Sequence, residues 1–129
     1  MTNTPGSARF KDICLDANDH QMLARWWCRI LGYEIMPLRS GEPRPVEWPI
    51  PIADPAGRDP FIWINPVPEK KIVKNRMHID VWGDVETLLA LGATTIRARG
   101  GDIEWHVLAD PEGNEFCVFA PEEPSTPLV

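Results

Sequence analysis

Short stretches along the chain alternate between apolar and polar residues, and this period of two predicts β-strands. Prolines cluster between these stretches, and because proline cannot donate a backbone hydrogen bond, its clusters exclude helix interiors and central strands. From Val46 to Ala53 prolines interrupt an extended segment, so we expect an edge strand there. The expected strands are Phe10–Asp16, Tyr33–Leu38, Val46–Ala53, Phe61–Asn65, Arg76–Trp82, Thr94–Arg97, Glu104–Leu108 and Glu115–Ala120.

Two helices are predicted between these strands. From Met22 to Leu31 apolar residues recur every three or four positions, which is the spacing of one helix face. A shorter helix is expected over Val85–Leu91. The residues placed to cap and end these helices are Asn18 or Asp19 with Gly32 for the first, and Asp84 with Gly92 for the second.

The order strand, helix, strand, strand, strand occurs twice, and each helix ends in Leu-Gly, at Leu31-Gly32 and at Leu91-Gly92. This order predicts an α+β fold of two βαβββ modules, with paired mixed sheets and the helices outside. The alternative is an α+β domain in which the order is a coincidence. The expected organisation is a tail over 1–9, one domain over 10–120 (modules at about 10–65 and 76–120, with a Pro- and Lys-containing connection over 66–75), and a tail over 121–129.

Strand alternation sorts the side chains into two faces. A solvated face would not hold so many aromatic residues as one of them does, and a core would not hold so many charges. A concave, partly wet cavity with aromatic walls accounts for both, so we expect a small-molecule site there. This mixed face comprises Asp12, Cys14, Asp16, Phe61, Trp63, Asn65, Arg76, His78, Asp80, Trp82, Glu115, Cys117 and Phe119. The apolar face, expected to pack beneath the helices, comprises Ile13, Leu15, Ile62, Ile64, Met77, Ile79, Val81, Phe116 and Val118.

Composition limits the class of protein. The 129 residues suit one hydrophobic core, and the net charge of −6 argues against binding a nucleic-acid backbone as the main role. No apolar run approaches the roughly 20 residues of a membrane span, and the first residues lack a signal-peptide pattern. The three cysteines form no Cys-x-x-Cys motif, so neither a disulfide framework nor a structural zinc site is expected. We therefore expect a cytoplasmic protein with no nucleic-acid or membrane partner.

Several segments resemble a known superfamily. Asp19–Gly32, with its pair of adjacent tryptophans, resembles the first-helix signature of the vicinal oxygen chelate superfamily, which includes glyoxalase I, bleomycin-resistance proteins and extradiol dioxygenases. Val67–Lys71, Val73–Val81 and the stretch from Trp105 through Asp110–Cys117 resemble a glyoxalase-like subgroup common in actinobacteria. The resemblance runs from about residue 10 to residue 120. It implies paired βαβββ modules around a U-shaped cavity, a small-molecule ligand and a homodimer.

The resemblance also implies positions for a divalent metal. In this superfamily His, Glu or Gln residues on the first and last strands of each module hold the ion, and by position these sites fall on Asp12, Asn65, His78 and Cys117. Cys117 stands where the family has Glu, and only one of the four is His, so the two-His-one-carboxylate iron site is absent. We therefore expect no resident metal cofactor. If a divalent metal binds, His78 and Asp12 are its expected ligands.

His78 and Asp12 are the candidate catalytic residues. An imidazole suits proton transfer and metal binding alike, and the alternative is a wall histidine hydrogen-bonded to Asp12 or Asp80. Cys117 is either a soft metal ligand or a small apolar filler. The basic run over 70–76 either anchors an anionic substrate or is a solvated linker. The expected ligand-lining residues are Trp63, Asn65, Arg76, Asp80, Trp82, Trp105 and Cys117.

Four functions remain open. The first is a glyoxalase-like lyase or isomerase acting on a small carbonyl or carboxylate substrate, with a degenerate metal site. The second is a metal-free protein that sequesters its ligand in an aromatic groove, as bleomycin-resistance members do. The third is a metal-free enzyme in which Asp12 and His78 form an acid–base pair. The fourth is a purely structural role.

Overall fold

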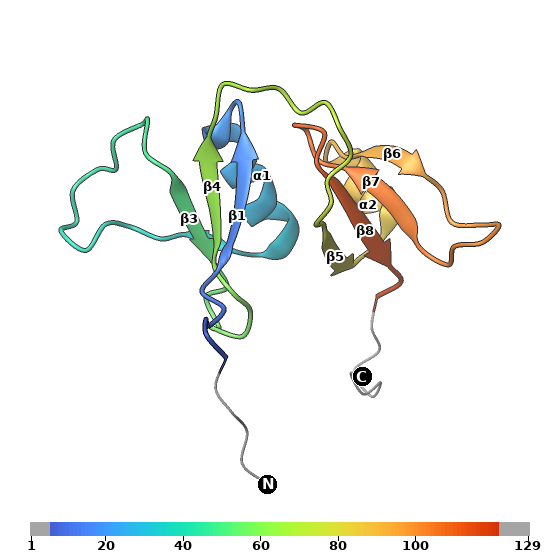
Figure 1. Ribbon diagram of the computed structural model, residues 1–129, viewed down its shortest axis with the longest axis horizontal. Helices are drawn as coiled ribbons and strands as arrows, with labels where there is room; N and C mark the ends of the chain where they lie inside the picture. Colours follow the sequence, from blue (N-terminus) through green and yellow to red (C-terminus); the bar gives the residue numbers. More distant parts are fainter. Residues whose placement is uncertain (1–5, 122–129) are drawn as a thin grey trace, which may run out of the picture. The chain divides into compact units, whose positions relative to one another are not determined.

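The structure, a computed structural model, describes residues 6–121, so the expected tails over 1–9 and 121–129 lie largely outside it. It contains two four-stranded mixed sheets, each with one helix, and is an α+β fold (Figure 1). The chain divides into two compact units between Pro68 and Glu69, inside the expected connection. Each unit has the order βαβββ, which confirms the predicted repeat. Within residues 6–121 no helix has the length and apolar character needed to cross a bilayer.

The first unit is built on a sheet with the strand order β1-β4-β3-β2. β1 is parallel to β4, and the other neighbouring pairs are antiparallel. The helix α1 follows β1 and packs on β3 and β4. The elements are β1 (Ile13–Ala17), α1 (His20–Leu31), β2 (Glu34–Ile35), β3 (Ile50–Ala53) and β4 (Ile62–Pro66).

Local signals fix both ends of α1. Of the two candidate caps, Asp19 is the one used, and its carboxylate accepts a hydrogen bond from the Met22 amide at 3.1 Å. At the other end Gly32 adopts φ 71°, a left-handed conformation that glycine enters without steric cost, and its N–H donates to the Cys28 carbonyl. The helix therefore begins and ends where the sequence predicts.

Isoleucines on β3 and β4 form the core beneath α1. The register pairs Ile50 with Ile64 and Ile52 with Ile62, and partners in a register lie on the same face of a sheet. All four are at most 3% exposed, and Trp27 of α1 is 1% exposed. Full burial of such side chains contributes roughly 1.5–3 kcal/mol each, so this layer is a main source of the unit's stability.

The second unit repeats this plan. Its sheet has the order β5-β8-β7-β6, with β5 parallel to β8, and its short helix is capped by Asp84, whose carboxylate accepts from the Thr87 amide at 3.1 Å. A tight turn precedes the last strand, and in it one Asp110 oxygen accepts from the amides of Glu112 and Asn114. The elements are β5 (Ile79–Trp82), α2 (Val85–Ala90), β6 (Thr94–Arg97), β7 (His106–Ala109) and β8 (Glu115–Phe119).

Several strands are shorter than predicted. β2 stops before Pro37, and β3 begins only after Pro49, because each proline removes a backbone donor from the ladder. The prediction of an edge strand over Val46–Ala53 is wrong, because β3 lies between β4 and β2. Pro51 is tolerated there because β2 has already ended opposite it, and only its carbonyl takes part, accepting from the Met36 amide at 2.9 Å.

β5 begins at Ile79 instead of Arg76, and pairing with β8 starts there. The expectation that Met77 packs beneath a helix is therefore wrong: outside the strand its side chain is 84% exposed.

Candidate functional site

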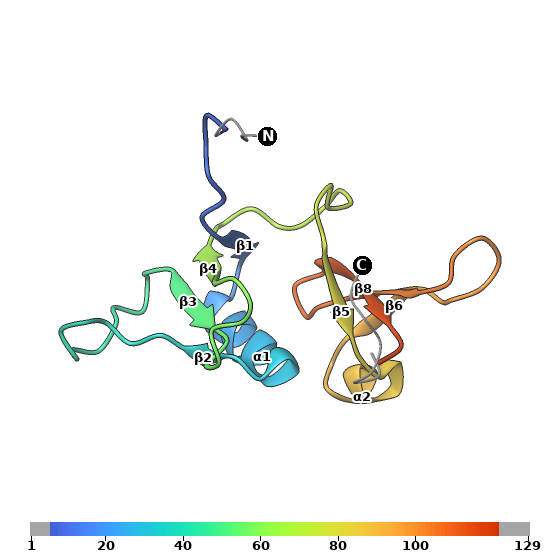
Figure 2. The same cartoon turned by 90° about the horizontal axis from the view of Figure 1, so that it is seen from below.

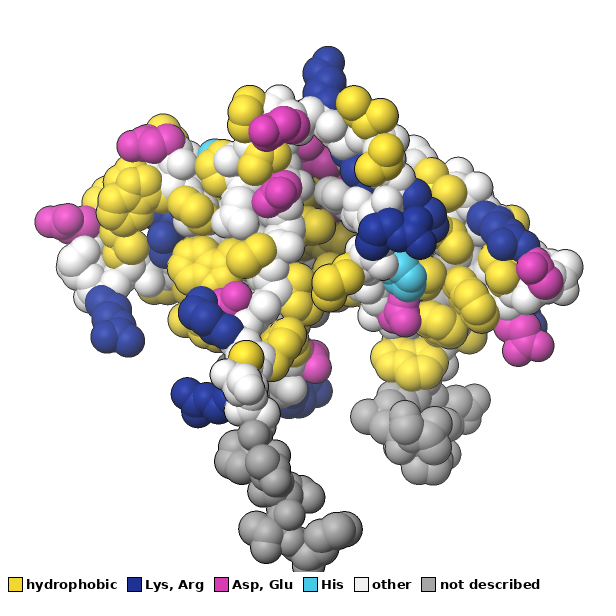
Figure 3. Space-filling view, in the orientation of Figure 1, with side chains coloured by type: hydrophobic (Ala, Val, Ile, Leu, Met, Phe, Trp, Pro, Cys, Tyr) yellow, Lys and Arg dark blue, Asp and Glu magenta, His cyan; other side chains and the backbone are white. Residues whose placement is uncertain are grey.

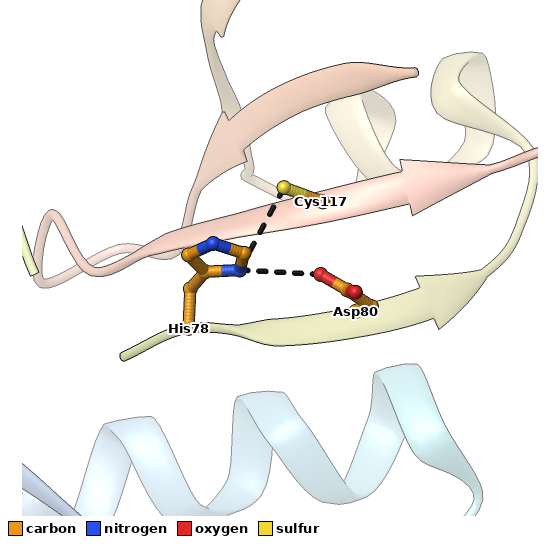
Figure 4. Close-up of side chains that lie close together, drawn as sticks. All are labelled: His78, Asp80 and Cys117. Atoms are coloured by element: carbon orange, nitrogen blue, oxygen red, sulfur yellow. Dashed lines mark hydrogen bonds and ion pairs between the residues drawn. The ribbon is translucent and has the colours of Figure 1, made fainter. Parts of the chain in front are cut away.

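The second unit gathers three chemically active side chains on one face of its sheet. β5 and β8 are paired so that Asp80 lies opposite Cys117, and His78, two residues before Asp80, extends from the same side (Figure 4). His78 Nδ1 lies 3.2 Å from Asp80 Oδ1 and 3.7 Å from Cys117 Sγ. The prediction that His78 and Cys117 share a face is confirmed.

This face is the one away from α2. Figure 2 shows α2 against one side of the second sheet. On that side a methyl group added to Gly83 would lie 3.4 Å from Leu88 of α2 and 3.8 Å from Val118 of β8. Val118 and Phe116 are each 1% exposed. Because neighbours along a strand point to opposite faces, Cys117 and Phe119 lie on the side that α2 does not cover.

The contacts of His78 suggest how its ring is protonated. A carboxylate is a stronger acceptor than a thiol, so we assign the Nδ1 proton to the hydrogen bond with Asp80. Nε2 then carries the lone pair, which can accept a proton. The sequence left open whether Asp12 or Asp80 is the partner of His78, and the structure places Asp80 there.

Cys117 is held in its neutral form. The residue is 5% exposed, and this burial raises the pKa of its thiol. The neighbouring Asp80 carboxylate raises it further, against smaller opposing effects of Lys74 and Trp105. The side chain is therefore a buried thiol at neutral pH, a weak donor rather than a nucleophile.

Aromatic rings extend the site along the same face. The Phe119 ring packs against Trp82 with centroids 6.0 Å apart and against Trp105 with centroids 5.7 Å apart. A shallow cavity of about 250 Å³ lies here, lined by Asp80, Val81, Trp82 and Phe119. In the space-filling view a histidine and a carboxylate lie together at the surface of this unit, beside hydrophobic side chains (Figure 3). Alternation placed Phe119 on the mixed face of the sheet, two residues after Cys117, but the expected ligand-lining residues did not include it.

In the first unit Asp12 and Trp63 form a separate contact. The indole Nε1 of Trp63 donates to Asp12 Oδ2 at 2.8 Å, and Lys11 Nζ lies 2.6 Å from the same oxygen. The Lys11 hydrogen bond and, to a smaller extent, that of Trp63 lower the pKa of Asp12 below its usual value. Asp12 is therefore a weak proton acceptor at neutral pH. Its expected convergence with His78 on one cavity stays a prediction.

The remaining candidate residues lie on β4 and in the segment before β5, and their contacts differ. Asn65 lies opposite Asp16 in the register of β4 and β1, and Arg76 is exposed before β5. Lys71 of the basic run forms an ion pair with Glu115 at 3.2 Å, and the Asn75 amide donates to the same carboxylate at 3.1 Å. These contacts hold the segment that leads to His78 against β8. Lys71 is thus a structural residue, whereas Lys74 is exposed.

The chain has two mixed sheets, each formed by a βαβββ unit, and an imidazole directly before the first strand of the second unit. These features define the class of two-module small-molecule proteins to which the glyoxalases belong. The family model of the glyoxalase-like domain matches residues 12–119. The chain belongs to this family, within the glyoxalase/bleomycin resistance/dioxygenase superfamily. No curated protein sequence matches the chain.

Solved structures share the fold at low sequence identity. FosX, a fosfomycin resistance protein from Listeria monocytogenes solved with Mn(II), has a TM-score of 0.66 at 13% identity, covering 89% of this chain and 93% of its own. FosX from Mesorhizobium loti has a TM-score of 0.64 at 14% identity, covering 88% and 92%. A glyoxalase/bleomycin resistance protein/dioxygenase family enzyme from Burkholderia phytofirmans has a TM-score of 0.59 at 18% identity, covering 84% and 94%. At these identities the likeness concerns the fold alone.

Proposed function

We propose that the chain binds a small carbonyl or carboxylate compound on the open face of its second sheet and moves a proton on it, as a lyase or isomerase. The observation that carries this proposal is the convergence of His78, Asp80 and Cys117 beside exposed aromatic surface. Polar groups of this kind orient a ligand, while Trp82, which is 57% exposed, offers a flat apolar contact.

In this mechanism His78 is the proton carrier. Its Nε2 accepts a proton from the substrate, while Asp80 holds the ring through Nδ1 and stabilises the imidazolium that forms. The Cys117 thiol supplies a weak hydrogen-bond donor at the edge of the site. Asp12, with its lowered pKa, contributes a fixed negative charge in the first unit rather than a base.

A divalent metal fits the same three residues. The ligand atoms of His78, Asp80 and Cys117 all lie within 4.8 Å of one another. To hold an ion through Nδ1, His78 would give up the proton that it donates to Asp80. A thiol and an imidazole suit Zn²⁺ better than the Mn²⁺ seen in the Listeria relative. When bound, such an ion supplies Lewis-acid polarisation of a carbonyl oxygen. Because only one of the four positions that the resemblance assigns to metal ligands is His, and Cys117 stands where the family has Glu, we propose that no metal is resident.

The second candidate function is metal-free sequestration of a ligand, as the bleomycin-resistance name of the relatives suggests. Trp82 favours it, because a large exposed indole on a binding face contacts a ligand without any chemistry. In this case Trp82 and Phe119 carry the affinity, and His78 only orients the ligand.

Ligand binding by matched variants tests the proposal. Small aromatic carboxylates, carbonyl compounds, fosfomycin and bleomycin are screened by thermal shift, with and without Zn²⁺ or Mn²⁺, and followed by calorimetry and turnover assays. We expect Trp82→Ala to weaken binding, and His78→Asn to abolish turnover while binding persists. His106→Asn is the matched control, since His106 lies opposite Val118 and so on the other face of this sheet. Binding without turnover supports sequestration. If compounds bind the Trp82→Ala variant as they bind the unmodified chain, and His78→Asn leaves any turnover unchanged, the site is wrong.

The proposal also covers domain organisation, cellular location, oligomeric state and partners. We propose that residues 10–120 act as one domain, in a cytoplasmic homodimer that binds neither nucleic acid nor membrane. The free state of Cys14, Cys28 and Cys117 supports a reducing compartment, and the net charge of −6 opposes phosphate-backbone binding.

A further inference from the structure

The first unit contains a cavity that belongs to no part of the site described above. Its volume is about 330 Å³, at the lower end of the roughly 300–1,000 Å³ typical of small-molecule pockets. It lies between α1, the edge of β2 and β3, and the proline-rich loop that joins these two strands. Apolar side chains form most of its wall, among them Ile35, Met36, Leu38, Val46 and Ile50.

This cavity is on the opposite face of the first sheet from Trp63. Ile50 lines it, and the register pairs Ile50 with Ile64 in the core beneath α1. Trp63 is paired with Pro51 and therefore points to the other side. A ligand in this cavity would not touch the Asp12–Trp63 contact.

Arg44 brings a positive charge into the wall. Its guanidinium bridges the two ends of the loop, since Nη2 donates to the Met36 carbonyl at 3.0 Å and Nη1 to the Pro49 carbonyl at 3.4 Å. Its Nε is buried and has no hydrogen-bond partner among the described residues. No carboxylate within residues 6–121 forms an ion pair with it, although Glu42 also lines the cavity.

The wall around this charge is held in place before any ligand arrives. The Val46 carbonyl lies 2.7 Å from His20 Nε2 and accepts from Gln21 Nε2 at 3.1 Å, so the loop is fastened to the start of α1. The cavity is thus an open apolar pocket, with Ile35 and Val46 exposed at its rim, and a half-buried arginine in its wall has no ion-pair partner among the described residues. These are the features of a receptor for an amphipathic anion.

We propose that this cavity binds a small organic anion, a carboxylate with a short apolar body, whose head group is held by Arg44. A guanidinium has five N–H donors, and the two carbonyl contacts leave Nη protons for a carboxylate. The apolar body lies against Ile35, Leu38 and Val46. This site is independent of the proposed function, because it uses no residue of the second unit.

Calorimetric titration with hexanoate, and with hexanamide as the uncharged analogue, tests the proposal on the full chain. We expect hexanoate to bind and hexanamide to bind at least about tenfold more weakly, because the charged hydrogen bond is lost. Arg44→Gln should weaken hexanoate binding by a similar factor. Glu42→Gln should strengthen it severalfold, because a like charge leaves the cavity. Arg39→Gln is the matched control: Arg39 is an exposed arginine of the same loop that does not line the cavity, and the affinity should not change.

Each result of these titrations either supports or overturns the proposal. If Arg44 had a purely structural role, replacing it would change the stability of the ligand-free chain. The chain would then bind hexanoate no better than hexanamide, and Glu42→Gln would not raise the affinity for hexanoate. If Arg44→Gln fails to fold, the Glu42→Gln variant and the amide still test the charge. Absence of hexanoate binding at millimolar concentration, or equal affinity for the acid and the amide, overturns the proposal.

Discussion

At the scale of single residues, burial separates three thiols that look alike in the sequence. Cys14 is exposed, whereas Cys117 is 5% exposed and Cys28 is partly buried. Burial is also the main cause that raises the pKa of both Cys28 and Cys117. Since the thiolate is the reactive form, both should react slowly at neutral pH.

We therefore predict that iodoacetamide at pH 7 modifies Cys14 well before Cys28 and Cys117. Peptide mapping by mass spectrometry over time measures the three rates in one sample. Unfolding in urea is the control, because it should make the three rates similar. Fastest labelling at Cys117 would mean that the thiol is ionised beside His78, and would contradict the neutral thiol in the proposed mechanism.

Asp54 shows how one carboxylate stabilises a turn in a pH-dependent way. It follows β3 and accepts from the Ala56 amide at 2.9 Å and from the Arg58 amide and Nε at 3.3 Å. The Ala56 hydrogen bond is the main cause that lowers the pKa of Asp54 below its ordinary value of 3.8, and Arg58 lowers it further. A lowered folded-state pKa gives stability that is present above the ordinary value and lost as the pH falls through the folded value.

We predict that Asp54→Asn unfolds at lower urea concentration than the unmodified chain at pH 7, and that this difference shrinks below about pH 4 as the native carboxylate is protonated. Urea titrations at pH 7, 4 and 3 measure it. Asp59→Asn, an exposed neighbour, is the control and should track the unmodified chain. A difference that stays constant from pH 7 to pH 3 would rule out this role.

At the scale of elements, Gly32 is the position where backbone conformation restricts the choice of residue. Its φ of 71° ends α1, and a methyl group there would meet no atom within 4 Å, so any cost of substitution is conformational. We predict that Gly32→Ala lowers the free energy of unfolding by about 1–2 kcal/mol. Gly32→Asn should cost less, because asparagine enters the left-handed region more easily. Equal stability of all three chains in chemical denaturation would show that α1 ends differently.

The elements also show what sequence reasoning can reach. The faces of β5 were predicted correctly, because a slip of one residue would bury Asp80 and expose Val81. The ends of the strands were not predicted, because the ends of β2, β3 and β5 depend on prolines and on where the partner strand begins.

The candidate site was partly predictable for the same reason. Alternation alone places His78, Asp80 and Cys117 on one face, and the register then brings them within contact distance. The hydrogen bond between His78 and Asp80 depends on side-chain conformations within one short segment, which alternation does not contain. Nothing in the sequence predicted the cavity beside Arg44, because the proline-rich loop that forms part of its wall has no periodic pattern of apolar residues.

At the scale of the whole molecule, large apolar side chains remain at the surface of both units. Phe10 before β1 is 75% exposed, and Ile72, Val73 and Met77 before β5 are 89%, 77% and 84% exposed. Monomeric proteins seldom expose three large apolar side chains in one short segment, as over residues 72–77, and exposed apolar surface of this kind is typical of interfaces between subunits.

We predict that the chain is a homodimer in solution, at about twice the 14.6 kDa mass of one chain. Covering Val73 and Met77 would remove apolar surface from water, so Val73→Glu and Met77→Glu should each weaken association by placing a charge in the interface. Ile96→Glu is the matched control, because Ile96 is a 56% exposed side chain on β6, away from this segment, and should leave the dimer intact. Sedimentation velocity over a range of concentrations measures all four chains. A monomer at every concentration would refute the dimer, and a dimer that is equally stable in all variants would place its interface elsewhere.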